Sequence, residues 1–167
     1  MKLSRLFLYS SLLVLAACGF HLKGLSSTTQ QLPYSEWRVV NGSALHDALS
    51  TEISRQKDAR INPQADAVLQ VIEAVQSRDI QTLNRSGAVN EYLLVLRLTA
   101  QAKYQGQDLG EPMTVVVQRN FSYSDNELLG KQQEEADLWQ DIYRDAAGQM
   151  VRRMSFLPQA ATPEAKP

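Results

Sequence analysis

Apolar and polar residues alternate most regularly between Tyr92 and Tyr104. A period of two is typical of a β-strand that turns one face toward a core. The same alternation returns from Met113 to Tyr123, and the polar stretch between the two segments, Gln105 to Gly110, contains glycine. The pattern therefore predicts two strands joined by a hairpin loop.

Two further strands are predicted before this pair. Trp37 to Val40 is a short strand-like segment, and Asn41-Gly42-Ser43 turns the chain after it. Ala67 to about Leu83 is rich in valine, leucine and isoleucine. Its alternation is imperfect, and we expect one long strand there. Arg85-Ser86-Gly87 is then a turn into the strand that follows.

Two helices are predicted from apolar residues three and four positions apart. Ser43 is expected to cap the first helix, which runs to about Gln56. The second runs from about Gln132 to Met154, and Ser124 or Asp125 is expected to cap a turn before it. The apolar residues behind these predictions are Leu45, Ala48, Leu49 and Ile53 in the first helix, and Ala136, Trp139, Ile142, Tyr143, Ala146, Ala147, Met150 and Met154 in the second.

The order strand, helix, three strands, helix predicts an α+β fold. Strands joined by short turns are antiparallel neighbours, and each helix has one apolar stripe to bury. We therefore expect a two-layer sandwich, in which a four-stranded, mostly antiparallel sheet carries both helices on one face. Leu93 and Val95 would place apolar side chains on the other face. They are either ordinary exposed apolar residues or part of a surface that contacts a partner or lipid.

The first 17 residues have the organisation of a signal peptide. Lys2 and Arg5 precede an apolar run from Leu6 to Leu15, and this run is shorter than the roughly 20 residues that cross a bilayer. Leu15-Ala16-Ala17-Cys18 follows. It is either the cleavage site of an ordinary secretory signal or, because cysteine comes directly after the small residues, a match to the lipobox of bacterial lipoproteins. In the second case residues 1–17 are removed and Cys18 becomes a lipidated N-terminus.

Cys18 is the only cysteine, so the chain can form no intramolecular disulfide. Acylation would remove a thiol that is a liability in an oxidising compartment, and stable anchoring needs more than one acyl chain. The likeness to lipoproteins implies about three chains, palmitate among them. We expect residues 18–35 to be the lipidated N-terminus and linker, residues 36–158 the folded domain, and residues 159–167 a disordered tail.

The charge balance argues against a nucleic-acid partner. The chain has 17 basic and 18 acidic residues; without Lys2 and Arg5 the mature chain has 15 basic residues and a net charge of −3. It therefore lacks the overall positive field on which nucleic-acid binding depends. No second apolar segment is long enough to cross a membrane.

Motifs for catalysis are missing from the sequence. It has no His-Glu-x-x-His run, no Gly-x-Ser-x-Gly elbow and no phosphate-binding glycine loop. Of its two histidines, His21 lies beside Cys18 and His46 lies at the start of the first predicted helix. We predict no enzymatic activity, no metal and no cofactor. The alternative is a periplasm-facing lipoprotein of the envelope, either an adaptor or an enzyme.

The best acids for such an enzyme would be Glu91, Asp125 and Glu134. Glu134 has a simpler explanation, since acidic residues favour a helix N-terminus through the helix dipole. Two cations also stand out: Arg85 in the turn between two strands, and Lys131 directly before the last helix. Solvation is the simplest reason for a surface cation. Arginine can, however, bind a phosphate in a bidentate manner, and lysine supplies a mobile point charge.

One sequence segment resembles a known family closely. Cys18-Gly19-Phe20-His21-Leu22-Lys23-Gly24 is similar to the start of the mature lipopolysaccharide-assembly lipoproteins of the LptE family. The resemblance covers nearly the whole mature chain, although Ser122 to Leu129 looks expanded relative to enteric members and the C-terminal tail is shorter. Its further segments are Arg85-Ser86-Gly87, Glu91-Tyr92, Arg119-Asn120-Phe121, Tyr143-Arg144-Asp145-Ala146-Ala147 and Met150-Val151-Arg152-Arg153.

This resemblance implies an α/β sandwich held on the periplasmic side of the cell outer membrane by its lipidated Cys18. Gly19, where inner-membrane lipoproteins of enteric bacteria have aspartate, agrees with that location. The family implies a plug inside the barrel protein LptD, support for assembly of that barrel, and delivery of lipopolysaccharide to the outer leaflet. It also implies lipopolysaccharide binding, to which Arg85 and Lys131, by their match to cationic family positions, would contribute.

Overall fold

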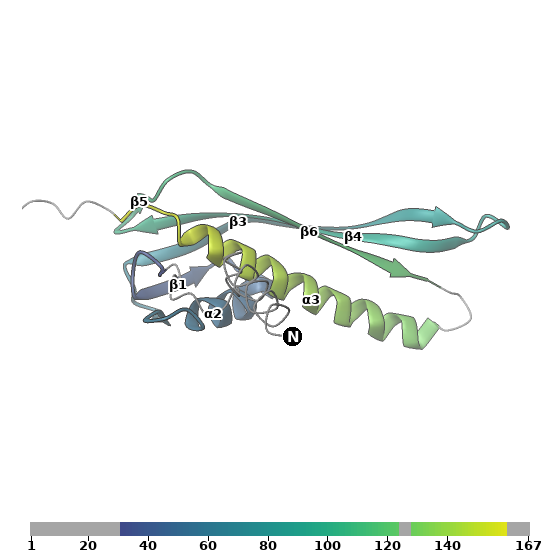
Figure 1. The fold of residues 1–167 in the computed structure, drawn as a ribbon, viewed down its shortest axis with the longest axis horizontal. Helices are drawn as coiled ribbons and strands as arrows, with labels where there is room; N and C mark the ends of the chain where they lie inside the picture. Colours follow the sequence, from purple (N-terminus) through teal and green to yellow (C-terminus); the bar gives the residue numbers. More distant parts are fainter. Residues whose placement is uncertain (1–30, 124–127, 160–167) are drawn as a thin grey trace, which may run out of the picture.

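The computed structural model describes residues 31–123 and 128–159 (Figure 1). The predicted signal peptide, Cys18, most of the predicted linker, the suggested caps Ser124 and Asp125, and most of the predicted tail lie outside the described residues. In chain order the elements are β1 (Glu36–Val40), the 3-10 turn η1 (Ser43–Leu45), α2 (His46–Ser54), β2 (Arg60–Ile61), β3 (Ala67–Leu83), β4 (Val89–Tyr104), β5 (Gln107–Asp108), β6 (Met113–Ser122) and α3 (Leu128–Met154).

The described sheet is mixed and has six strands, which corrects the prediction of four mostly antiparallel ones. Its order is β2-β1-β3-β4-β5, and β6 pairs with β4 as well. β1 is parallel to β2 and β3 because α2 carries the chain back across the sheet between them. The sequence does not predict β2 and β5, because two residues are too few to show the alternation of a strand. The α+β class holds, and both helices lie on one side of the sheet (Figure 1).

The prediction that Ser43 caps the first helix is wrong. Ser43 begins η1 with a positive φ of 44°, and no side chain caps either η1 or α2. The backbone closes the turn instead, because the Leu45 amide donates to the Gly42 carbonyl at 2.9 Å. A Cβ on Gly42 would lie 2.8 Å from Cα of His46, so the approach of these two backbones requires glycine.

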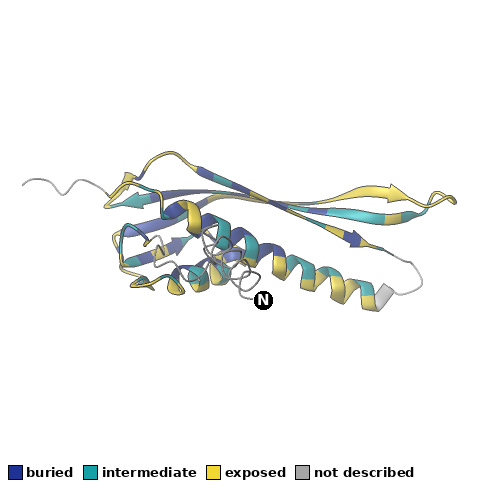
Figure 2. Ribbon diagram, viewed as in Figure 1, coloured by how far each residue is buried: buried dark blue, intermediate teal, exposed yellow. Residues whose placement is uncertain are grey.

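The core lies between the helices and one end of the sheet, formed by the first part of β3, the later part of β4 and the buried face of β6. On β4 every second residue from Leu94 to Ala102 is fully buried, which confirms the alternation. The apolar stripe of α3 is buried only from Ile142 onward; Ala136 is exposed and Trp139 is half-buried. The N-terminal half of α3 therefore extends beyond the core, as Figure 2 shows by its colours.

The hairpin of β3 and β4 extends past the core in the same direction. β1 pairs with β3 only as far as Gln70, so among the described residues no strand covers the outer edge of β3 from there to Leu83. The alternation of β3 is imperfect because its register shifts at Ile72 and again at Gln81. Between these bulges, Glu73–Ile80 is a regular stretch with an open edge. We call the end of the molecule that holds the β3–β4 turn the distal end.

Candidate functional site

Arg85 lies in the turn at the tip of the hairpin and is exposed. The Asn84 side chain accepts hydrogen bonds from the amides of Ser86 (2.9 Å) and Ala88 (3.0 Å), and Gly87 has a φ of +84° that favours glycine. The turn is thus held by the hydrogen bonds to the Asn84 side chain and by the backbone conformation of Gly87. Within the described residues, Arg85 forms no ion pair or side-chain hydrogen bond, so its guanidinium faces solvent.

Lys131 lies in the first turn of α3, near where β6 ends. The prediction that it precedes the last helix is therefore wrong, because α3 begins at Leu128 and not at about Gln132. Its side chain is only 15% exposed, so it is not the solvated cation that the sequence suggests. Nζ lies 2.7 Å from Oε2 of Glu134 and 5.7 Å from the ring centroid of Phe121. A ligand that bound this ammonium would compete with the carboxylate one turn along the helix.

Arg85 and Lys131 lie at the same end of the molecule but not side by side. Lys131 is near Phe121, which is in register with Tyr92 and, through it, with Ile80. Arg85 is five residues further along the hairpin, or roughly 15 Å at the rise of a β-strand. This separation favours contacts with different anionic groups of one large ligand over contacts of both cations with a single phosphate.

A third cation, Arg78 on β3, lies closer to Lys131. Its guanidinium carbon is 3.9 Å from the ring centroid of Tyr92 and 5.9 Å from that of Phe121, and Nη1 lies 3.4 Å from a carboxylate oxygen of Glu135 on α3. Tyr92, Phe121 and Tyr123 form what we call the aromatic cluster, with centroids 5.4–6.4 Å apart. Sequence reasoning missed Arg78, because the bulge at Ile72 hides which face of β3 it occupies.

Further toward the core, polar side chains connect α3 to the strands. Arg119 on β6 is 2.8 Å from Asp145 on α3, and Gln149 donates to the same carboxylate at 3.1 Å. The hydrogen bonds from Gln149 and Arg119 lower the pKa of Asp145 below its ordinary value. Gln76 on β3 donates to the Tyr143 hydroxyl. These contacts fix the rotation of α3 against the sheet.

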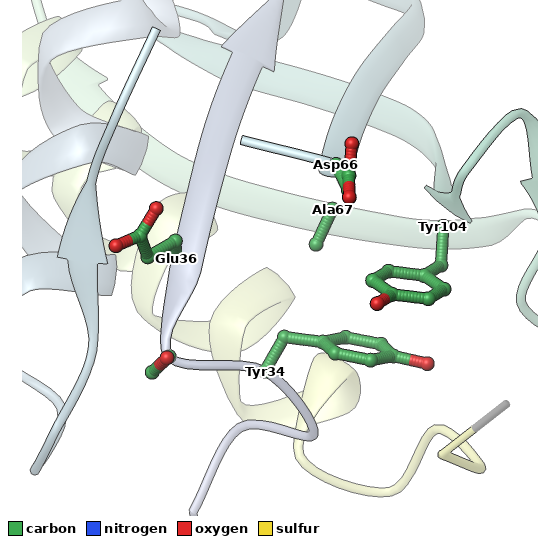
Figure 3. A pocket seen from close by; sticks show the side chains of 6 residues that line it. Tyr34, Glu36, Asp66, Ala67 and Tyr104 are labelled. Carbon is green, nitrogen blue, oxygen red and sulfur yellow. The ribbon is translucent and has the colours of Figure 1, made fainter. Parts of the chain in front are cut away.

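The opposite end of the molecule holds a small open cavity of about 190 Å³ (Figure 3). The rings of Tyr34 and Tyr104 stack beside it with centroids 4.1 Å apart. Glu36 lines the cavity as well; hydrogen bonds from Asn62 and Arg60 lower the pKa of its carboxyl. The Tyr34 stack and the burial of Leu32 show that residues 31–35, which the sequence assigned to the linker, pack against the domain.

Comparison with known proteins shows the family to which the chain belongs. The family described as LptE, lipopolysaccharide-assembly, matches residues 31–154. The chain belongs to the LptE family. It is 30% identical over 160 residues to the LPS-assembly lipoprotein LptE of Pectobacterium atrosepticum, which covers 92% of this chain and 85% of that protein. The corresponding Yersinia enterocolitica lipoprotein is 29% identical over 160 residues, covering 92% of this chain and 75% of that protein.

Solved structures with the same fold are also lipoproteins. The solution structure of lipoprotein B from Nitrosomonas europaea matches with a TM-score of 0.66 and 26% identity, over 82% of this chain and 90% of that one. The crystal structure of a minor lipoprotein from Acinetobacter baumannii matches with a TM-score of 0.60 and 26% identity, over 76% of this chain and 95% of that one. The predicted family is thereby confirmed over the folded domain.

The LptE family is one of lipopolysaccharide-assembly lipoproteins and not of enzymes. The acids considered for an enzyme do not form a site either. Glu91 lies on the sheet face opposite its neighbour Tyr92, whereas Glu134 lies on the helix side and binds Lys131. Asp125 is outside the described residues. Within the described ranges no group of acids and histidines could hold a metal, and no helix is long and apolar enough to cross a bilayer.

Proposed function

We propose that this LptE-family protein forms a plug complex with an outer-membrane barrel protein of the LptD kind. In that complex it supports assembly of the barrel and delivery of lipopolysaccharide to the outer leaflet, which it also binds. The observation that carries the proposal is the family match over nearly the whole domain. A rigid core with a long projecting hairpin is also a suitable shape for insertion into a barrel, since the hairpin exposes apolar residues such as Ile80 and Leu83.

We further propose that the chain is anchored at the periplasmic side of the outer membrane through acylated Cys18. The segment Leu15-Ala16-Ala17-Cys18 and the relatives' description as lipoproteins support this. Residues 19–30 lie between Cys18 and the first described residue, Gln31. We propose that this segment is a linker, long enough for the domain to reach a partner that lies in the same membrane.

Purification from detergent-solubilised outer membranes tests the complex. An affinity tag at the C-terminus should recover a large barrel protein in a 1:1 ratio with this chain. The intact mass of the recovered chain should correspond to an acylated polypeptide that begins at Cys18. Recovery of the lipoprotein alone, from extracts in which other outer-membrane complexes stay intact, would refute the plug complex.

We propose that Arg85 and Lys131 contact anionic groups of lipopolysaccharide. Reversing both charges, Arg85→Glu with Lys131→Glu, should weaken lipopolysaccharide binding. A hydrogen bond to a charged group contributes about 1.5–3 kcal/mol, and about 1.4 kcal/mol corresponds to a tenfold change in Kd, so we expect a loss of at least about tenfold per contact. Surface-immobilised lipopolysaccharide and the purified mature chain give the measurement.

A matched control changes the net charge equally at two exposed residues away from the distal end, Lys57→Glu with Arg153→Glu. This variant should bind as the wild type does. If both double variants weakened lipopolysaccharide binding equally, only the net charge of the molecule would matter for binding. Unchanged binding by the Arg85 and Lys131 variant would make these two residues ordinary solvated or structural cations.

A further inference from the structure

On the distal half of the hairpin, α3 covers the helix side of the sheet only in part. Arg78 and Ile80 on β3 pair with Leu94 and Tyr92 on β4, so all four side chains point to the helix side of the sheet. Leu94 is fully buried, but Ile80 is 61% exposed and the Arg78 side chain is 39% exposed. At this point a cation and an apolar side chain, two residues apart on one strand, face solvent together.

We propose that Arg78, held on the aromatic cluster, is a phosphate-binding residue for an acylated lipid, with Ile80 contacting the acyl chain. The inference deepens the proposed function and rests on it, because the ligand class is that of a phosphorylated lipid. It adds a cation that neither the family resemblance nor the comparisons assign.

The surroundings of Arg78 orient its guanidinium for such a contact. The guanidinium carbon lies 3.9 Å from the Tyr92 ring centroid, a cation–π contact that holds the group against the ring. Among the described residues Arg78 forms one ion pair, to Glu135, and its 3.4 Å separation is longer than the 2.7 Å between Lys131 and Glu134. A guanidinium has five N–H donors, so donors remain for a bidentate contact with phosphate.

The neighbouring groups match both parts of a phosphorylated lipid. Lys131 and Arg78 both lie within 6 Å of the Phe121 centroid, so two positive charges flank one ring. Glu134 and Glu135 keep these cations paired, and an incoming phosphate would take over their contacts. Leu83, which is 58% exposed, continues the apolar surface from Ile80 toward the hairpin tip. The phosphate would thus bind the two cations, while an acyl chain would lie along β3 against Ile80 and Leu83.

The test measures binding of the purified mature chain to lipopolysaccharide, to the same lipopolysaccharide after removal of its lipid A phosphates, and to vesicles of anionic phospholipid. Inorganic phosphate serves as a competitor that carries no acyl chain. For Arg78→Gln we expect at least a tenfold loss of affinity for intact lipopolysaccharide and little change for the dephosphorylated form. Arg78→Lys, which keeps the charge but loses the bidentate geometry, should fall between.

Two further variants separate this role from a structural one. Glu135→Gln breaks the same ion pair but keeps the guanidinium, so it should bind lipopolysaccharide as tightly as the wild type or more tightly. Arg97→Gln removes an exposed arginine from the opposite face of the hairpin, in register with Val75, and should leave binding unchanged. Thermal unfolding of each variant checks that the domain stays folded.

The inference is overturned if Arg78→Gln binds intact lipopolysaccharide like the wild type, or loses affinity equally for the dephosphorylated form. It is also overturned if Glu135→Gln weakens binding as much as Arg78→Gln, because the role of Arg78 would then be only the structural ion pair with α3. Failure of the wild type to bind lipopolysaccharide would instead remove the binding part of the proposed function. Preference for phospholipid vesicles over lipopolysaccharide would keep Arg78 as a phosphate ligand but overturn the lipid source.

Discussion

Replacing Ala146 with aspartate is expected to reduce the free energy of unfolding of the domain by about 3–5 kcal/mol, the cost of an uncompensated buried charge. Ala146 is fully buried in the stripe of α3 that packs on β6 and α2. An aspartate there would be removed from water without a cation beside it, or would have to take up a proton. Since domains of this kind unfold at a total cost of about 5–15 kcal/mol, a substantial fraction of the molecules would be unfolded in mild denaturant.

The measurement is equilibrium unfolding of the mature chain in urea, followed by far-UV circular dichroism. Gln140→Asp is the matched control, because it places the same residue in the same helix at an exposed position. Its effect should stay within about 0.5 kcal/mol, as for most surface substitutions. An equal loss in both variants would mean that aspartate disturbs the helix itself rather than the packing of its buried stripe.

Removing Cys18, the proposed site of the lipid anchor, is expected to release the protein from membranes. A chain exported with an ordinary secretory signal and beginning at Gly19 has no residue to acylate, since Cys18 is the only cysteine. Each buried methylene contributes about 0.8 kcal/mol to membrane binding, so the loss of several acyl chains cannot be offset by exposed side chains. No described helix could hold the chain in the bilayer instead. Fractionation of cells should show the change from membrane to soluble fraction.

The proposed barrel partner complicates this test, since it could retain the unanchored chain. The experiment therefore uses expression well above the level of the partner, where only a saturable minority should stay bound. Comparison with the natural signal sequence at equal expression gives the control. If the excess chain that begins at Gly19 still sediments with membranes, the anchor lies elsewhere and the proposal for Cys18 fails.

Strong periodicity made the long strands predictable. The bounds of β3 agree with the prediction, and the alternation on β4 identifies the residues that are buried. β1 was found as a strand, but its parallel direction depends on how α2 packs, which no local pattern encodes. The prediction of a cap at Ser43 is wrong because a backbone hydrogen bond to Gly42 closes the turn. A capping side chain is only one of several ways to begin a helix.

The candidate site was less predictable than the fold. Arg85 could be placed in its turn because Asn84, Ser86 and Gly87 are typical turn residues. Lys131 is covered by contacts to Glu134 and Phe121 that depend on the position of α3 against β6, so its burial could not be inferred. Arg78 required the register of β3, and a single bulge is enough to reverse the face of every residue that follows it.

The open edge of β3 also bears on the behaviour of the isolated protein. Glu73–Ile80 presents eight residues of regular backbone without proline, glycine or lysine. An extended segment of another chain could pair with this edge and enlarge the sheet. The bulges at both ends limit how far such pairing can spread. Concentrated samples without a partner should therefore self-associate through this segment first, and a lysine or proline placed within it should keep them monomeric.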